Sequence, residues 1–169
     1  MIFVFSDFGQ RASYMGQMAA VLQRAAPEIP AVTLTAHAPA FDPYRSAYLL
    51  AAESAIARPG DVVLAVVDPG VGTERTPLAL GADGVWYVGP DNGLFQQVAR
   101  RAAVVEPCAI TWRPQRMSPS FHGRDLFAPT AAALARGETA GWSPCRCPRA
   151  VPTGRTTSIR SSSSTTTAT

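Results

Sequence analysis

Short apolar runs alternate with longer stretches of helical spacing along the first part of the chain. The apolar runs are Met1–Phe5, Ala31–Leu34 and Val62–Val67. Runs without polar alternation are typical of strands buried on both faces of a parallel sheet. Between them, Ser13–Ala26 carries apolar side chains at three- and four-residue spacing, and Tyr44–Ala57 is rich in Ala and Leu, so both predict helices. This alternation predicts an α/β domain with a largely parallel sheet and helices on both faces.

The pattern changes in the second half of the domain. Leu78–Leu80 and Val85–Val88 flank Asp83-Gly84, a pair of residues that favours a hairpin turn, so two antiparallel strands are expected here. Three further elements are predicted: a helix over Leu94–Ala102, a strand over Ala103–Val105 and a helix over Leu126–Leu134. Pro129 is compatible with the last helix only in its first turn.

The chain changes character after Arg136. Residues 137–169 lack apolar periodicity and end in SSSSTTTAT, so they are predicted to be a disordered, low-complexity tail, while residues 1–136 form the α/β domain. The abrupt switch suggests translation in a shifted reading frame. Of the 15 Arg, 11 lie in residues 1–136 beside 11 acidic residues, and the tail holds four Arg against one Glu, so the whole net charge of +3 comes from the tail. A basic patch on the folded domain, and hence a nucleic-acid partner, is not expected.

Other bulk features narrow the class further. No apolar run is long enough to span a membrane and no secretory leader is evident, so a cytoplasmic protein without a membrane partner is expected. The three cysteines, Cys108, Cys145 and Cys147, provide neither a disulfide framework nor a zinc-ligand spacing, so no metal is expected.

Polar residues follow the predicted strands at their carboxyl ends, where open α/β sheets bind ligands. Asp7 follows the first strand, and Asp68 follows the third and precedes a Gly-containing loop that leads to Arg75. His122 precedes the last helix. Each has a structural alternative: a solvated salt bridge for Asp68 and Arg75, and helix capping for Asp7 and His122. Their common place in the loops of one sheet favours a site.

Four motifs carry a resemblance to a known family. They are SDFG at 6–9, VVDPGVGTER at 66–75, GPDNGL at 89–94 and FHGRDLFAP at 121–129. In this order and spacing they resemble the S-adenosyl-L-methionine (SAM) hydroxide adenosyltransferases of the fluorinase/chlorinase superfamily, and the resemblance covers residues 1–136. It implies the Rossmann-like N-terminal domain of that family, with SAM as a small-molecule substrate and no cofactor.

The resemblance implies hydrolysis of SAM to adenosine and L-methionine, by attack of water or hydroxide on the ribose 5′ carbon. The catalytic set of the family corresponds to Asp68, Arg75 and His122. Asp68 and His122 would orient and deprotonate the water, and Arg75 would keep Asp68 charged. Asp7 corresponds to the acidic residue that binds the ribose hydroxyls. Two aromatic side chains correspond to positions that line the substrate: Phe41 and Phe121.

The same motifs leave alternatives to SAM hydrolysis open. The halide-using relatives carry a tyrosine at the position of Asp68, so the carboxylate favours hydroxide over a halide adenosyltransferase that uses chloride. The acidic residue that the family usually has near Ala12 is absent. Members usually also carry a C-terminal β domain and assemble as trimers, and this chain has no sequence for that domain. The truncation leaves open reduced activity, loss of the homotrimer, or a catalytically dead nucleoside-binding remnant.

Overall fold

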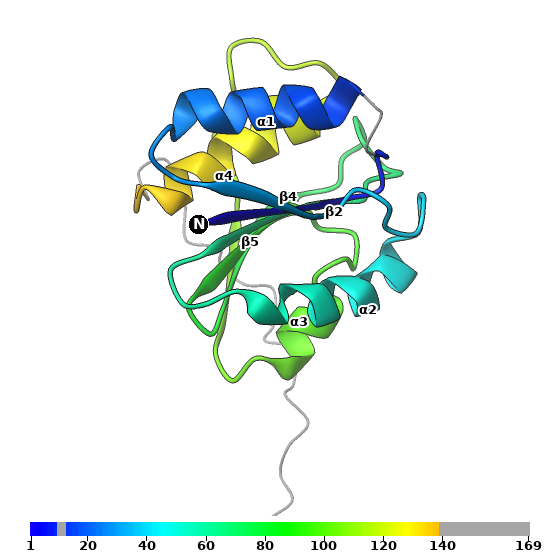
Figure 1. Ribbon diagram of the computed structural model, residues 1–169. Helices are drawn as coiled ribbons and strands as arrows, with labels where there is room; N and C mark the ends of the chain where they lie inside the picture. Colours follow the sequence, from blue (N-terminus) through cyan, green and yellow to red (C-terminus); the bar gives the residue numbers. More distant parts are fainter. Residues whose placement is uncertain (10–12, 139–169) are drawn as a thin grey trace, which may run out of the picture.

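The fold is a three-layer α/β sandwich, seen in a computed structural model that describes residues 1–9 and 13–138 (Figure 1). Six strands form one sheet in the order β2-β1-β3-β5-β4-β6. The strands are β1 Ile2–Ser6, β2 Ala31–Thr35, β3 Val62–Val66, β4 Pro77–Ala82, β5 Val85–Pro90 and β6 Val105–Ala109. The helices are α1 Ser13–Ala25, α2 Pro43–Glu53, α3 Gln96–Arg101 and α4 Ala128–Ala135, and α1 and α4 cover one face of the sheet while α2 and α3 cover the other.

The predicted largely parallel sheet is confirmed. β1 pairs in parallel with β2 and β3, and β3 pairs in parallel with β5. β4 is antiparallel to both of its neighbours, β5 and β6, as expected for strands added by a hairpin. All residues of β1 and β3 are buried, which explains their continuous apolar character.

Two cores lie on the opposite faces of the sheet, and strand alternation assigns side chains to them. Ile2 and Val4 pack with α1 and α4, whereas Phe3 and Phe5 pack on the side of α2 and α3. Both faces therefore exclude water, and the open edge at the carboxyl ends of the strands is left for a ligand.

The predicted strand Ala103–Val105 begins two residues before the strand in the structure. β6 begins at Val105, because the Asp83 carboxylate accepts hydrogen bonds from the amides of Ala103 (3.0 Å) and Val104 (2.8 Å) and holds them outside the sheet. β6 is an edge strand, so Pro107, which has no N–H to donate, is tolerated in it.

The last helix also differs in detail from the prediction. A π-helical turn, Gly123–Phe127 (η2), precedes α4, and Pro129 lies in the first turn of α4 as the pattern required. Two other predicted helices are shorter in the structure. α2 ends at Glu53 and is followed by a 3₁₀ turn, Ser54–Ile56, and α3 begins only at Gln96.

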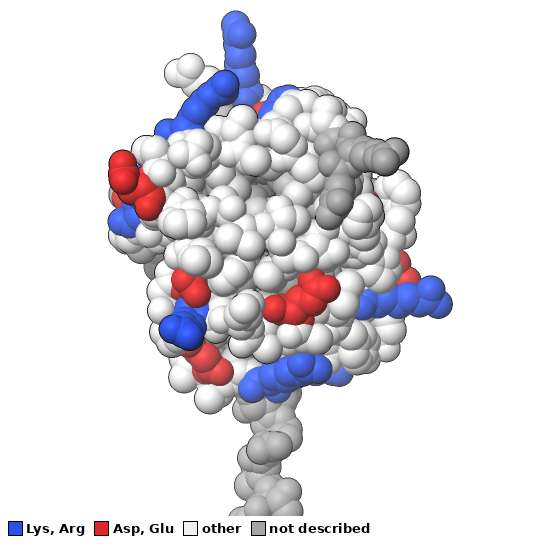
Figure 2. Space-filling model, in the orientation of Figure 1, with Lys and Arg blue, Asp and Glu red and all other residues white. Residues whose placement is uncertain are grey.

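The surface shows no concentration of one charge on the face drawn in Figure 2, where acidic and basic side chains are scattered. Within residues 1–9 and 13–138, no helix is long and apolar enough to cross a membrane. The predictions for residues 139–169, disorder and a shifted frame, lie outside the described residues, and the domain boundary at residue 136 stays a prediction.

Candidate active site

The loops after β1 and β3 place two carboxylates at the same edge of the sheet. Asp7 follows β1 and Asp68 follows β3 after the buried Val67. Close packing of β5 on β3 supports this edge: a Cβ added to Gly89 would collide with the Ala65 carbonyl oxygen. The Asn92 side-chain amide donates to the Val67 carbonyl at 2.9 Å. The GPDNGL motif therefore supports the strand end from which Asp68 projects.

Asp68 and Arg75 form a buried, bidentate ion pair. Arg75 Nε lies 2.9 Å from both Oδ1 and Oδ2 of Asp68, and Nη2 also donates to Oδ2. The side chains are 4% and 9% exposed for Asp68 and Arg75, respectively. Charged groups are rarely buried to this degree unless they are paired. The alternative of a solvated salt bridge is therefore wrong.

The glycine loop folds Arg75 back onto Asp68. Thr73 Oγ1 donates to the Gly70 carbonyl at 2.7 Å and tightens the turn. Gly72 has φ +81°, and a Cβ there would lie only 2.9 Å from the Pro119 carbonyl oxygen. Glycine is thus needed both for the left-handed backbone and for the approach of the segment that leads to His122.

His122, which lies 47 residues after Arg75 in the sequence, contacts the ion pair. Its Nδ1 lies 2.9 Å from Arg75 Nη2, and the ring is buried. A guanidinium can only donate, so Nδ1 must accept, and the neutral imidazole then carries its proton on Nε2. Burial, and next the Arg75 charge, lower the pKa of His122, which agrees with a neutral ring. Its side chain forms no capping hydrogen bond to η2, so the capping alternative is not supported.

Asp7 and Phe41 meet at the opposite side of the site. The Phe41 amide donates to Asp7 Oδ2 at 2.9 Å, so the carboxylate is oriented by the loop that precedes α2. Phe41 adopts φ +56°, a conformation that costs energy for a bulky L-residue. The strained backbone presents the ring outward, where it is 78% exposed. Such strain is characteristic of functional positions.

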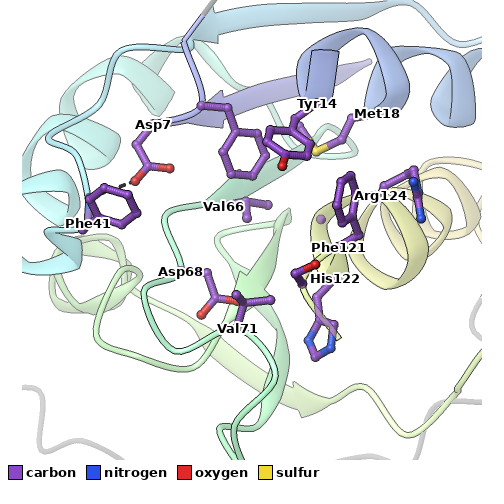
Figure 3. Close-up of a pocket in the computed structure, with 13 residues that line it drawn as sticks. Asp7, Tyr14, Met18, Phe41, Val66, Asp68, Val71, Phe121, His122 and Arg124 are labelled. Atoms are coloured by element: carbon purple, nitrogen blue, oxygen red, sulfur yellow. Dashed lines mark hydrogen bonds between the residues drawn. The ribbon is translucent and has the colours of Figure 1, made fainter. Parts of the chain in front are cut away.

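One cavity of about 290 Å³ contains these groups (Figure 3). Five of the six predicted site residues line it: Asp7, Phe41, Asp68, Phe121 and His122. Arg75 does not line it but lies behind Asp68 and His122, in contact with both. The structure thus brings the six residues into one site, while their individual roles remain predictions.

Further lining residues were missed from the sequence. They are Phe8, Tyr14, Met18, Val66, Val71, Ser120, Gly123 and Arg124. Five of them stand in the quoted family motifs: Phe8, Val66, Val71, Gly123 and Arg124. Tyr14 and Met18 are four residues apart and so share one face of α1. Both were predicted to lie on the apolar face of that helix, and neither was given a role in the site. Within the described residues no group of three or more His, Cys, Asp or Glu side chains could hold a metal ion.

Arg124 supports the aromatic wall of the cavity. Its guanidinium donates to Asp125 Oδ1 at 2.6 Å and to Gln17 Oε1 at 2.7 Å, and lies 4.4 Å from the centroid of the Phe121 ring. The Arg124 hydrogen bond is the main reason why the pKa of Asp125 is lowered. The charged part of the FHGRD motif therefore positions Phe121 and ties η2 to α1.

A cavity at the carboxyl ends of parallel strands, with a buried Asp–Arg–His cluster and a second carboxylate, has the place and composition of a candidate active site of the open α/β class. Residues 2–141 match the SAM hydroxide adenosyltransferase N-terminal domain. The chain belongs to the SAM hydroxide adenosyltransferase family.

Curated relatives and solved structures agree with this assignment. The chain is 47% identical over 150 residues to an (R)-S-adenosyl-L-methionine hydrolase of Thermus thermophilus, covering 80% of this chain and 57% of the relative. It is 42% identical over 136 residues to one of Salinispora arenicola, covering 78% and 52%. A conserved protein from Thermotoga maritima superposes with a TM-score of 0.78 at 34% identity, covering 81% of this chain and 54% of that structure. The chain thus spans about half the length of the relatives it matches.

Proposed function

We propose that this chain hydrolyses SAM to adenosine and L-methionine. The observation that carries the proposal is the buried Asp68–Arg75–His122 cluster, of which Asp68 and His122 line one cavity with a separate carboxylate, Asp7. The curated relatives named (R)-S-adenosyl-L-methionine hydrolase support the choice of substrate and reaction.

The reaction is a displacement at carbon. A water oxygen forms a bond to the ribose 5′ carbon while the bond from that carbon to sulfur breaks, and both bonding electrons go to sulfur. Methionine leaves as a neutral thioether, so the leaving group needs no proton. The only proton to be removed comes from the attacking water, which becomes the 5′ hydroxyl of adenosine.

The hydrogen bonds of His122 support different roles for Asp68 and His122. Nδ1 of His122 accepts from Arg75 and Nε2 carries the proton, so a neutral His122 has no free lone pair in the ring plane to act as a base. In this arrangement Asp68 takes the proton from water, and His122 donates a hydrogen bond from Nε2 to the water oxygen. Arg75 keeps both side chains in place with a guanidinium that is itself buried.

Asp7 would hold the other part of the substrate. Its carboxylate has one oxygen bonded to the Phe41 amide, which leaves the second oxygen for the ribose hydroxyls. The exposed Phe41 ring adjoins this carboxylate and would pack on the nucleoside. Substrate held at Asp7 can then present its 5′ carbon toward Asp68, and this fixed orientation would lower the barrier for the displacement.

A carboxylate at the attack position disfavours the halide alternative. A chloride ion placed beside Asp68 would meet a second negative charge in a buried site, where repulsion is stronger than in water. Water carries no charge and can donate a hydrogen bond to Asp68. Hydrolysis is therefore preferred over transfer to chloride.

The test is incubation of the purified chain with SAM in chloride-free and chloride-containing buffer. Adenosine and 5′-chloro-5′-deoxyadenosine are separated by chromatography, with an enzyme-free sample as the blank. Adenosine in both buffers is expected, lost in Asp68→Ala and retained in Glu28→Ala, a control that removes an exposed carboxylate outside the cavity. The chlorinated nucleoside would establish the halide reaction instead.

A third outcome would identify a binding remnant. If the folded chain binds SAM but releases neither product, the hydrolase proposal fails for this chain. A homotrimer and a cytoplasmic location stay predictions. Light scattering of the purified chain measures the first.

A further inference from the structure

Three aromatic rings form one wall of the cavity, and two of them, Tyr14 and Phe121, lie at the end away from Asp7 (Figure 3). The rings of Phe8 and Tyr14 have centroids 5.8 Å apart at an interplanar angle of 59°. Tyr14 and Phe121 meet edge to face, with centroids 4.6 Å apart at 65°. All three rings line the cavity. The sequence had identified only Phe121 among them as a site residue.

Tyr14 is the ring of this wall that is most available to a ligand. One face of Phe121 is already covered by the Arg124 guanidinium. Tyr14 has no cation over its ring and its hydroxyl makes no hydrogen bond within residues 1–9 and 13–138, and it is 43% exposed. A tyrosine in this state is not required by the core of the described domain.

The charges around the cavity favour a cationic ligand. Arg75 and Arg124 are each bonded to a carboxylate, Asp68 and Asp125. Asp7 forms no ion pair with any residue that the structure describes. A carboxylate without a cationic partner, together with open aromatic rings, is a combination that attracts positive charge.

We propose that Tyr14 recognises the positive charge of the SAM sulfonium through a cation–π contact, with Phe121 holding the tyrosine ring by its edge-to-face contact. The identity of the ligand rests on the proposed function. The ribose would lie at Asp7, the 5′ carbon beside Asp68, and the sulfonium against Tyr14. Tyr14 is then the residue that distinguishes charged SAM from neutral adenosyl thioethers.

This contact acts on the bound substrate and weakens during the reaction. As the bond from carbon to sulfur breaks, the sulfur loses its charge and the attraction to the ring fades. Tyr14 therefore stabilises the bound substrate more than the transition state. Loss of the ring is expected to raise KM for SAM without lowering kcat, whereas loss of a group that acts in the chemical step would lower kcat.

The experiment compares two ligands that cannot react. Sinefungin carries a protonated amine on a carbon that replaces the sulfonium, and S-adenosyl-L-homocysteine is the neutral thioether. Calorimetric titration gives the affinity ratio of the charged to the neutral ligand for the wild-type chain, Tyr14→Phe and Tyr14→Leu. The two ligands share the adenosine and amino-acid parts, so any loss of packing cancels in the ratio.

The wild-type chain and Tyr14→Phe are expected to prefer the charged ligand, and Tyr14→Leu is expected to lose roughly 5- to 30-fold of that preference. Tyr48→Leu, which removes an exposed tyrosine of α2 outside the cavity, should leave the ratio unchanged. Two outcomes would overturn the proposal: an unchanged affinity ratio in Tyr14→Leu, with or without equal weakening of both ligands, or binding of neither ligand to the folded wild-type chain. A charge preference that depends on Tyr14 in a chain that forms no adenosine would refute hydrolysis but retain this inference.

Discussion

Removal of Arg75 tests whether the ion pair with Asp68 is a structural and chemical unit. We consider Arg75→Met, which retains a flexible apolar side chain in place of the stem and deletes the charge. The substitution leaves the Asp68 carboxylate 4% exposed without its cation, and His122 Nδ1 without its donor. Arg75 also lies over the Phe127 ring, with 5.2 Å from Cζ to the ring centroid, so a cation–π contact is lost as well.

The expected loss in the free energy of unfolding follows from the burial of the Asp68–Arg75 ion pair. Two unit charges about 4 Å apart attract by about 4 kcal/mol at an effective dielectric constant of 20. Breaking a buried pair by removing one partner costs about 3–5 kcal/mol, because the remaining charge keeps its desolvation penalty. The whole free energy of unfolding of a domain is about 5–15 kcal/mol, so Arg75→Met is expected to remove a large share of it.

The assay is urea unfolding followed by circular dichroism, for Arg75→Met, Asp68→Asn and the double variant. Each single variant leaves an unpaired polar group, whereas the double variant removes both charges. We therefore expect the double variant to lose less stability than the sum of the single variants, by about 1–3 kcal/mol. Arg45→Met is the matched control, because Arg45 is 79% exposed and its ion pair with Asp42 is 3.4 Å long. That control should cost less than about 1 kcal/mol.

A loss of less than about 1 kcal/mol in Arg75→Met, equal to that of the Arg45→Met control, would refute the reasoning. So would single-variant effects that add up in the double variant, because additive effects indicate side chains that do not interact.

Three further predictions concern His122, Phe41 and the glycines. Burial and the Arg75 charge lower the pKa of His122 in the folded chain. The stability that the neutral ring contributes is therefore present above about pH 6.5, the pKa of histidine in the unfolded chain, and is lost as the pH falls below that value. Urea unfolding of the wild-type chain and of His122→Asn at several pH values measures this loss. Phe41→Val should lower the free energy of unfolding by about 1–2 kcal/mol, because a β-branched residue tolerates φ +56° poorly, whereas Phe41→Gly should cost less despite the larger loss of side chain. Gly89→Ala should destabilise the chain by about 1–3 kcal/mol or more, because the added Cβ collides with the Ala65 carbonyl. Gly16→Ala should stabilise the chain by about 0.4–1 kcal/mol, because an added Cβ there meets nothing within 4 Å. Thermal unfolding measures both changes.

Each of these has an outcome that contradicts it. For His122, the contradiction is an acid-induced loss of stability of the same size and midpoint in His122→Asn. Phe41→Gly less stable than Phe41→Val would show that the backbone strain is not costly. Equal effects of the alanine substitutions at Gly89 and Gly16 would show that β5 does not approach β3 as closely as described.

The sequence by itself determined the layers of this protein and the position of its site along the chain. Continuous apolar runs at β1 and β3 were sufficient to predict strands buried on both faces, since only a covered parallel sheet accommodates them. Asp7 and Asp68 could be assigned to one edge of the sheet because carboxyl ends of parallel strands meet there. The order and spacing of four motifs indicated the family, which the match over residues 2–141 shows.

Structural details that depend on single hydrogen bonds between distant residues could not be predicted from the sequence. The start of β6 at Val105 is decided by the Asp83 carboxylate, which lies in a distant turn and captures the two preceding amides. The π-helical turn before α4 likewise has no signature in residue spacing. Local propensity describes neighbours along the chain and does not register such long-range contacts.

Only the tertiary structure decided the burial, the protonation and the neighbours of the site residues. Burial of Arg75 against Asp68 distinguishes a buried ion pair from a surface salt bridge, and burial is a property of the whole fold. The tautomer of His122 follows from a donor 47 residues away in the chain, Arg75, and could not be inferred from the motif that contains the histidine. Tyr14 reads as a core-facing helical residue in the sequence, and it became a candidate for recognition of charge only when packing placed it beside Phe121 in the cavity.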